Sequence, residues 1–281
     1  MSSVCQFVTA SSIREDIVRL LAQQQQPTSK LIERLDACRS GVYKELSNLK
    51  QRGALTETED GWQLTACGQL VTDTIERRQT TEEFLGGDRE YWRQHDIGLL
   101  PDRFRRRLPE IGEYDIVRGE MPAVDRQVSE FLSRVDAGES PDVLTPIFVR
   151  GLEDAIADVS NTRVLVTSEV HDRLVGNEGD EPERDRAFLN ANVRIADAGF
   201  GLGCTGDSLC LVFPDQMDAE WQATLVSETD AGRQWGEQLF ESLWEDADPL
   251  GQMDTDSFRP TGRRGMVGKP NIWADSNHPY S

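Results

Sequence analysis

The sequence predicts an α+β protein in two parts, an N-terminal helical unit that ends in a β-hairpin and a C-terminal α/β domain. Three observations predict this fold class. Apolar residues recur at helical spacing through the first 85 residues, an Asp-Gly pair separates two short strand-like runs near residue 60, and strand-like and helix-like segments alternate beyond residue 88. With 281 residues, the chain is long enough to bury an apolar core in each part.

The composition is strongly acidic and poor in lysine. The chain has 50 acidic and 30 basic residues, a net charge of -20, and only four of its basic residues are lysines. Because surface carboxylates hold water and cations, we expect a cytoplasmic protein of a salt-rich cell, such as that of a halophilic archaeon. No stretch approaches the roughly 20 apolar residues that span a bilayer, so we expect no membrane segment. The hydrophobic content of 37% excludes wholesale disorder.

The five cysteines are an odd number and include no CxxC pair. This pattern argues against a disulfide framework and against a zinc ribbon or finger. We expect mostly buried, reduced thiols, with Cys38 and Cys67 as small buried apolar side chains.

Charge is distributed unevenly along the chain. Residues 1–87 have 10 basic and 12 acidic residues, whereas the remainder has 20 and 38. Within the first part, residues 28–52 have six basic and three acidic residues, including three of the four lysines. This local excess of positive charge is either a surface for a polyanion or an ordinary fluctuation.

The first two predicted helices are separated by a proline. Ile13, Ile17, Leu20 and Leu21 are spaced for one apolar helix face, and Pro27 ends that segment. Thr28 or Ser29 is expected to cap a second, short helix whose apolar residues are Leu31, Ile32 and Leu35.

A third helix is predicted over residues 39–52. Val42, Leu46 and Leu49 form its apolar face. After it, two strand-like runs at residues 54–59 and 62–64 flank Asp60-Gly61, which favours a type I′ hairpin turn. Two helices, a turn, a third helix and a hairpin are the elements of a winged helix-turn-helix, in which the third helix is the recognition helix and the hairpin is the wing.

Several segments resemble archaeal winged-helix transcriptional regulators. The first part of the likeness is carried by residues 31–35, 39–46, 49, 52–55 and 62–65. Residues 90–97 and 108–113 are similar to a haloarchaeal subset whose C-terminal domain was first described in a methanogenesis regulatory protein. The likeness extends from about residue 12 to residue 247. It implies a sequence-specific regulator that binds double-stranded DNA.

The sequence departs from that family at a few positions. Gly41 stands early in the recognition helix, where it costs about 1 kcal/mol of helix propensity relative to alanine. Asp36 and Glu45 place carboxylates near the expected path of a phosphate backbone.

In a winged helix-turn-helix the recognition helix lies in the major groove, which predicts the DNA-contacting residues. We expect Ser40, Tyr43, Lys44 and Ser47 to face base edges or the nearest phosphates, Arg39 and Lys50 to contact the backbone, and the wing from Thr58 to Trp62 to lie over the adjacent groove. Because helix-turn-helix proteins usually read paired half-sites, we also expect a homodimer. The helix from Ala66 to Leu85 and the C-terminal domain are the candidate interfaces.

Three domains are predicted. They are a DNA-binding domain with its following helix at residues 1–87, an α/β domain at residues 88–250 and a disordered or loosely docked tail at residues 251–281. In the second domain we expect strands at 114–117, 163–167, 192–196, 209–213 and 221–226, helices around 124–135 and 235–243, and a further patterned segment at 148–157.

The α/β domain offers no positive case for catalysis, and we expect no enzyme activity, cofactor or metal. Gly201-x-Gly203-x-x-Gly206 matches the dinucleotide fingerprint, but a strand rather than a helix should follow it. His95 and His171 each precede an aspartate, and we expect both to be structural or surface residues. A metal site made of Cys204, Cys210 and His171 is a minor alternative whose spacing fits no known pattern. The arginines at positions 103, 105, 106 and 107 pair with nearby acids or, alternatively, contact flanking DNA.

Two functions compete at this point. A transcriptional regulator explains both parts of the chain, and its α/β domain either senses a small-molecule effector or only dimerises. A metabolite-binding protein or enzyme with an accessory winged-helix module explains only the second part. An effector pocket would lie near Ser168, Glu169 and the glycine-rich turn at residues 199–206, because pockets in α/β domains favour the carboxyl ends of strands.

Overall fold

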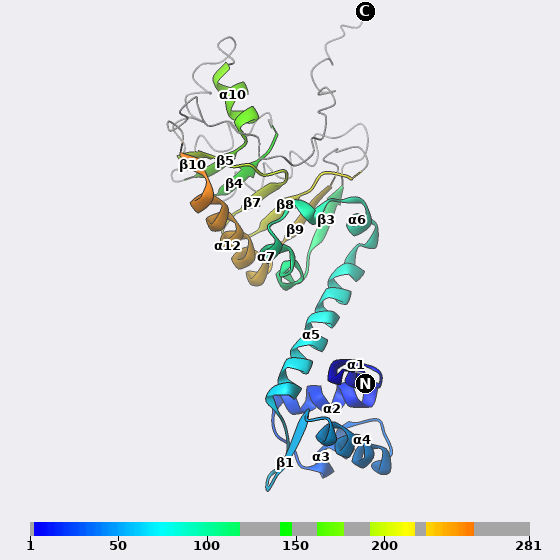
Figure 1. The fold of residues 1–281 in the computed structure, drawn as a ribbon. Helices are drawn as coiled ribbons and strands as arrows, with labels where there is room; N and C mark the ends of the chain where they lie inside the picture. The colour runs from blue at the N-terminus through cyan, green and yellow to red at the C-terminus, as the bar shows by residue number, and fades with distance from the viewer. Residues whose placement is uncertain (1–2, 119–140, 148–161, 177–191, 217–222, 250–281) are drawn as a thin grey trace, which may run out of the picture.

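The computed structural model describes residues 3–118, 141–147, 162–176, 192–216 and 223–249. Within these residues, two bodies of structure lie at the two ends of one long helix, α5 (Ala66–Gly87) (Figure 1). Helices and a hairpin surround the lower end of α5, and a mixed β-sheet lies at its upper end. The predicted fold class is confirmed.

Four helices and a hairpin form the N-terminal unit. They are α1 (Val4–Thr9), α2 (Ser12–Gln23), α3 (Thr28–Arg34), α4 (Arg39–Gln51), β1 (Leu55–Thr58) and β2 (Gly61–Leu64). Their apolar residues share one core, in which Ile17, Leu31 and Leu46 have no exposed surface. The predicted order of elements is confirmed. Helix α1 was not predicted, because six residues are too few to show a helical period.

The hairpin turn differs from the predicted type I′ turn on Asp60-Gly61. Thr58 pairs with Gly61, so the connecting residues are Glu59 and Asp60. Gly61 has a φ of 130°, and a Cβ there would lie 2.4 Å from the carbonyl oxygen of Gln26. Glycine is therefore required at this position because β2 passes against the segment before α3, where Trp62 exchanges two backbone hydrogen bonds with Gln26.

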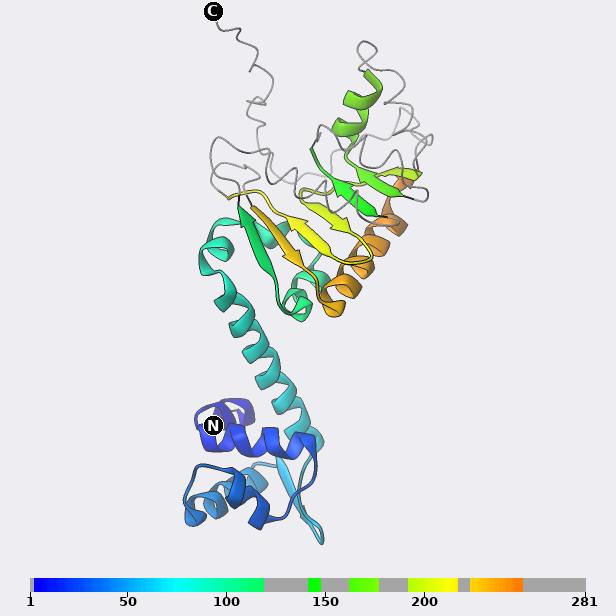
Figure 2. The same ribbon diagram turned by 180° about the vertical axis from the view of Figure 1, so that it is seen from behind.

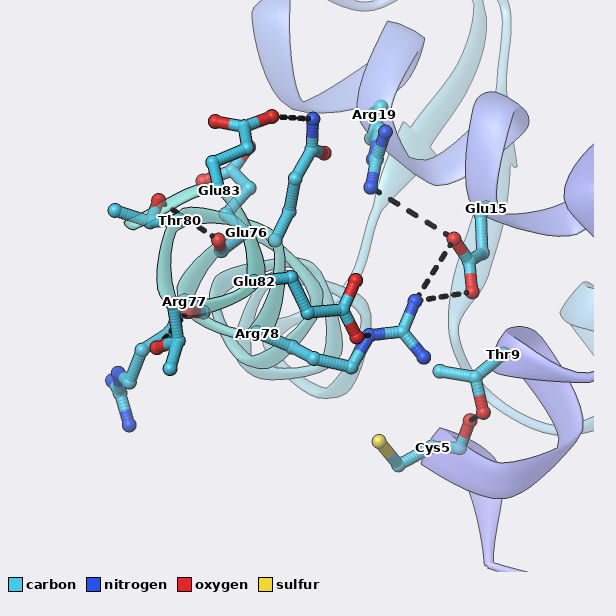
Figure 3. Close-up of polar contacts among 12 residues, drawn as sticks. Cys5, Thr9, Glu15, Arg19, Glu76, Arg77, Arg78, Thr80, Glu82 and Glu83 are labelled. Carbon is cyan, nitrogen blue, oxygen red and sulfur yellow. Dashed lines mark hydrogen bonds and ion pairs between the residues drawn. The ribbon is translucent and has the colours of Figure 1, made fainter. Parts of the chain in front are cut away.

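Helix α5 is held against the N-terminal unit along its first half only. Val71 and Ile75 are buried in the N-terminal core, whereas no residue between Ile75 and Phe84 is buried. An ion-pair network marks the last polar contact with α2 (Figure 3). In it, Nη2 of Arg78 lies 3.1 Å from Oε1 of Glu15, and Nη2 of Arg19 lies 3.8 Å from the other oxygen of that carboxylate.

An aromatic cluster holds the upper end of α5. Short helices follow α5: α6 (Arg89–Gln94), η1 (Ile97–Leu99), α7 (Asp102–Arg105) and η2 (Leu108–Ile111). The rings of Trp92 and Tyr114 each have their centroid 4.8 Å from that of Phe84, and the hydroxyl of Tyr114 donates to the carbonyl of Phe84. The predicted break at Gly86-Gly87 falls slightly later, because both glycines are helical and α5 ends at Gly87, with Asp88 as its C-cap residue.

Among the described residues, the C-terminal domain contains an eight-stranded sheet in the order β10-β6-β5-β4-β7-β8-β9-β3. Strands β4, β5 and β6 are parallel to one another, and the other pairings are antiparallel. The strands are β3 (Asp115–Arg118), β4 (Asp142–Thr145), β5 (Arg163–Val166), β6 (Asn192–Ile195), β7 (Gly201–Cys204), β8 (Leu209–Val212), β9 (Ala223–Ser227) and β10 (Asp248–Pro249), with α10 (Ser168–Gly176) following β5.

Helix α12 (Asp230–Asp246) packs on one face of this sheet, and Figure 2 shows the sheet from the opposite side. Two glycines let it approach closely. A Cβ at Gly232 would lie 2.5 Å from Oγ of Ser227, and one at Gly236 would lie 2.6 Å from Sγ of Cys204. Trp235 and Leu239 of α12 are buried in the core that the helix forms with the sheet.

Some predicted elements lie outside the described residues: the helix around residues 124–135, the segment at 148–157, Trp221 and the tail from 251 to 281. The predicted strands at 114–117, 163–167, 192–196 and 209–213 are confirmed to within a residue or two. In the part of the chain that the structure describes, no helix combines the length and apolarity needed to cross a membrane.

Candidate nucleic-acid interface

Packing divides α4 into a buried side and an exposed side. Val42, Leu46 and Leu49 have no exposed surface and fix the helix on the N-terminal core. The predicted apolar face of the third helix is therefore confirmed, and the side chains opposite it must point to solvent.

The exposed side of α4 presents hydroxyl, phenol, amide and cationic groups. Tyr43 is 52% exposed, which is unusual for a large aromatic residue. Hydroxyls and amides of this kind can hydrogen-bond to base edges, and cations can pair with phosphates. The exposed residues on and beside this side are Arg39, Ser40, Tyr43, Lys44, Ser47, Lys50 and Gln51.

The N-terminal end of α4 carries an exposed thiol, contrary to the expected buried one. Cys38 precedes the helix, with its sulfur 3.4 Å from Oγ of Ser40. The hydroxyl of Ser40, and next the backbone N–H of Gly41, lower the pKa of the Cys38 thiol below its ordinary value. A Cβ at Gly41 would lie 3.3 Å from that sulfur, so glycine leaves room for it. Cys67 is also exposed, at the start of α5, whereas Cys204 and Cys210 are buried as expected.

Lys50 does not present a free charge. Its ammonium lies 2.8 Å from Oε2 of Glu57 on β1 and 5.5 Å from the ring centre of Trp62. The pair is half exposed, so it is open to solvent, but it directs the lysine toward the wing. Lys44 and Arg39, in contrast, make no ion pair with any described residue.

Trp62 is buried rather than presented to a groove. Its side chain is only 7% exposed, and its indole N–H donates to the hydroxyl of Thr28 at 3.0 Å. The tryptophan therefore anchors β2 to the start of α3, and its side chain has little surface left to contact DNA. The hydroxyl of Thr28 accepts this bond. The N-cap residue of α3 is Pro27, and not Thr28 or Ser29 as predicted.

One polar residue outside the wing contacts its tip, and periodicity did not reveal it. The side-chain amide of Gln25 donates to the hydroxyl of Thr58, which donates in turn to the carbonyl of Gly61. Gln25 is exposed and lies 33 residues from Thr58 in sequence. The run of glutamines at residues 23–26 is a possible sequence signal, but nothing local in it specifies the wing as its partner.

The carboxylate of Glu45 faces inward and not toward the expected path of DNA. It is 9% exposed, and its Oε2 lies 2.6 Å from Nε of Arg14 on α2. The hydrogen bond from Arg14 lowers the pKa of this carboxyl, against the opposing effect of burial. The expected electrostatic conflict at Glu45 is therefore absent, whereas Asp36 remains exposed in the turn between α3 and α4.

In the second domain, the glycine motif, the two cysteines and His95 are part of the packed structure, as predicted. The glycine motif forms β7 and the turn into β8, as expected for a strand-turn-strand. Cys204 pairs with Leu209 and Cys210 with Gly203, so adjacent-strand register puts the two thiols on opposite faces of the sheet. His95 is buried and stacked on Tyr91, with ring centres 4.0 Å apart, and burial lowers the pKa of its imidazole. Within the described ranges, no cluster of three or more metal-ligating side chains is present.

The arginine cluster after residue 102 mostly pairs with neighbouring acids, as expected. Arg105 lies 2.6 Å from Asp102, Arg107 lies 2.8 Å from Glu110, and Arg103 donates to Ser242 on α12. The two ion pairs are local, whereas the bond from Arg103 to Ser242 and a bond of 3.0 Å from Arg107 to the side-chain oxygen of Gln238 connect this segment to α12.

The described residues combine a helix-turn-helix unit with a wing, a solvent-facing polar helix and an attached sheet domain, an arrangement typical of transcriptional regulators. Two family models match parts of the chain. Residues 124–246 match the middle domain of methanogenesis regulatory protein FilR1, and residues 3–83 match the HVO_A0261 N-terminal domain. The resemblance predicted from the sequence, to an archaeal transcriptional regulator with a C-terminal domain of the methanogenesis-regulatory-protein type, is confirmed over these two ranges.

Comparison with solved structures finds a distant likeness. TrmBL2, an archaeal chromatin protein whose structure shows a novel mode of DNA binding, is 13% identical, with 85% of this chain and 93% of that chain covered and a TM-score of 0.38. No curated protein matches the sequence.

Proposed function

We propose that this protein is a regulator that binds double-stranded DNA by placing α4 in the major groove. The observation that carries the proposal is the division of α4 into a fully buried apolar side and an exposed side of hydroxyl, phenol, amide and cationic groups. Ser40, Tyr43, Lys44 and Ser47 would contact base edges or the nearest phosphates, and Arg39 would contact the backbone.

The wing has a smaller role in this proposal than the sequence alone suggested. Thr58, with Gln25 beside it, is the polar group that would lie over the adjacent groove. Lys50 contacts a phosphate only if it leaves Glu57. The negative charge of the chain does not prevent binding, because at about 1 M salt the Debye length is about 3 Å and only close contacts count.

Substitution of the exposed face of α4 tests the proposal. Lys44→Ala and, separately, Tyr43→Ala should weaken binding to a DNA duplex selected from a random library by the wild-type protein. A lost base contact costs about 1–3 kcal/mol, or at least several-fold in affinity. Thermal unfolding should not change, because neither side chain is buried. Arg93→Ala, at an exposed cation on α6, is the matched control. Equal affinity of Lys44→Ala, Tyr43→Ala and the wild type in molar KCl would contradict the assignment of this face.

We also propose a homodimer. One N-terminal unit offers few contacts to DNA, and a dimer that binds two half-sites would double them. Two large apolar side chains on α5 favour this arrangement. Leu70 is 69% exposed and Leu85 is 41% exposed, and their spacing of 15 residues puts them about 60° apart around the helix.

The C-terminal domain would contribute dimerisation or effector sensing. The sheet places Thr145, Val166 and Ile195 at one edge, where Ser168 and Glu169 begin α10. Gly201 lies near the same edge because β7 runs antiparallel to β4, whereas Cys204–Gly206 lie at the opposite edge. A small-molecule effector would therefore bind near the first of these edges. If residues 1–87, joined artificially as a dimer, reproduced condition-dependent regulation, the sensing role would be excluded.

A further inference from the structure

A largely buried carboxylate, that of Glu45, lies on the recognition helix. Oε2 of Glu45 accepts hydrogen bonds from Nε of Arg14 at 2.6 Å and from Nδ2 of Asn48 at 3.2 Å. Asn48 belongs to the same helix, whereas Arg14 belongs to α2. The middle of α4 is therefore bound to α2 by a charged contact as well as by the apolar core.

Arg14 connects this contact to α1. Its Nη1 donates to the carbonyl of Phe7 at 2.8 Å, and its guanidinium carbon lies 3.8 Å from the centre of the Phe7 ring. The guanidinium carbon of Arg52, at the C-terminal end of α4, lies 3.9 Å from the same centre. Two guanidinium groups this close to one ring must occupy its two faces, so Phe7 lies between Arg14 and Arg52.

The orientation of α4 is consequently set at two points, one near its middle and one at its end. A 13-residue helix is about 20 Å long, so a rotation of about 10° about its centre moves each end by nearly 2 Å. Hydrogen bonds to base edges do not survive displacements of that size. Small changes in the tilt of α4 would therefore remove sequence-specific contacts and leave the longer-range attraction to phosphates in place.

We propose that Arg14, Glu45 and Phe7 are positioning residues for DNA readout, through which α1 and α2 set the tilt of the recognition helix. The proposal rests on the proposed function and assigns to α1 a role in it. For Glu45 it predicts the opposite of what repulsion between this carboxylate and DNA phosphates would predict. If this carboxylate only repelled phosphates, neutralising it would strengthen binding to every DNA sequence. If it positions α4, neutralising it weakens binding to the preferred sequence only.

The test uses the full-length protein in molar KCl at a temperature well below its unfolding midpoint. Its probes are a duplex selected from a random library by the wild type and a scrambled duplex of the same length. Fluorescence anisotropy should show that Glu45→Gln binds the selected duplex about tenfold more weakly, the effect of losing a charge-assisted hydrogen bond. Binding to the scrambled duplex should stay equal or become tighter. Glu33→Gln, at an exposed carboxylate on α3, is the matched control and should not lower the preference for the selected duplex.

Two further variants keep the proposal testable if Glu45→Gln unfolds. Phe7→Leu retains apolar bulk but removes the ring between the two arginines, and it should lower the preference for the selected duplex by a few-fold. The exchanged pair R14E with E45R should recover part of the preference that E45Q loses. Unchanged preference in both Glu45→Gln and Phe7→Leu would overturn the proposal. Failure of the wild type to select any duplex would instead overturn the proposed function.

Discussion

At the scale of single residues, Gly68 shows how closely α5 approaches the hairpin. A Cβ at this position would lie 2.1 Å from the carbonyl oxygen of Ala54, which already accepts hydrogen bonds from the backbone N–H and the hydroxyl of Thr65. The oxygen cannot move without breaking these bonds. Gly68 is therefore required for packing and not for backbone freedom.

Gly68→Ala should lower the free energy of unfolding by about 1–3 kcal/mol or more, because the added methyl group overlaps a fixed backbone atom. Gly86→Ala, in the same helix, is the matched control. A Cβ at Gly86 meets nothing within 4 Å, so this change should stabilise by up to about 1 kcal/mol through helix propensity. Chemical denaturation followed by circular dichroism measures both. Equal effects of the two changes would contradict the close approach.

At the scale of elements, the wing and α4 are connected by Lys50 and Glu57. The two charges lie 2.8 Å apart, and each side chain is about half exposed. The pair contributes little to stability in water, yet it determines where the lysine charge points. Glu57 therefore restrains a cation that could otherwise contact a phosphate.

Glu57→Gln should strengthen DNA binding and increase the magnitude of the salt slope, because Lys50 then becomes free to contact one more phosphate. One added contact changes the slope of log K against log salt by about 1. Glu90→Gln, on α6, removes the same charge at a distant exposed site and serves as the control. Affinity titrations between moderate and molar KCl make the comparison. If both variants behave alike, the change reflects net charge and not the release of Lys50.

At the scale of the whole molecule, α5 is the only described helix that joins the two bodies of structure (Figure 1). Arg78 and Glu15 hold it at the N-terminal unit, and the aromatic cluster around Phe84 holds it at the sheet domain. Between Arg78 and Phe84 no side chain of α5 is buried. Two large apolar residues of the helix, Leu70 and Leu85, are also exposed, one toward each end of it.

Light scattering in molar salt should give twice the 31.6 kDa of one chain. Leu70→Glu should shift the protein toward the monomer if α5 forms the interface, because it would bury two like charges near each other. Asp73→Glu, at an exposed acid on the same helix, is the control and should leave the mass unchanged. A single chain mass for the wild type, with and without DNA, would contradict the homodimer. A dimer unaffected by Leu70→Glu would place the interface in the C-terminal domain.

Local pattern was sufficient for most of the described elements, though not for α1, and for the exposed face of α4. Val42, Leu46 and Leu49 recur at helical spacing, and a helix with one apolar side must bury that side, so the opposite residues face solvent. Strands β3, β5, β6, β8 and β9 were predicted from runs rich in β-branched and apolar residues, whereas β4 and β10 were not predicted.

Tertiary structure alone decided which polar and aromatic side chains turn inward. Glu45 binds Arg14, 31 residues away, and Trp62 binds Thr28, 34 residues away. Cys38 and Cys67 became exposed because the apolar core closes without them. The sequence determines the period of each element and therefore its buried side. The partner of a polar side chain depends on which distant elements packing brings together, and no local period records that.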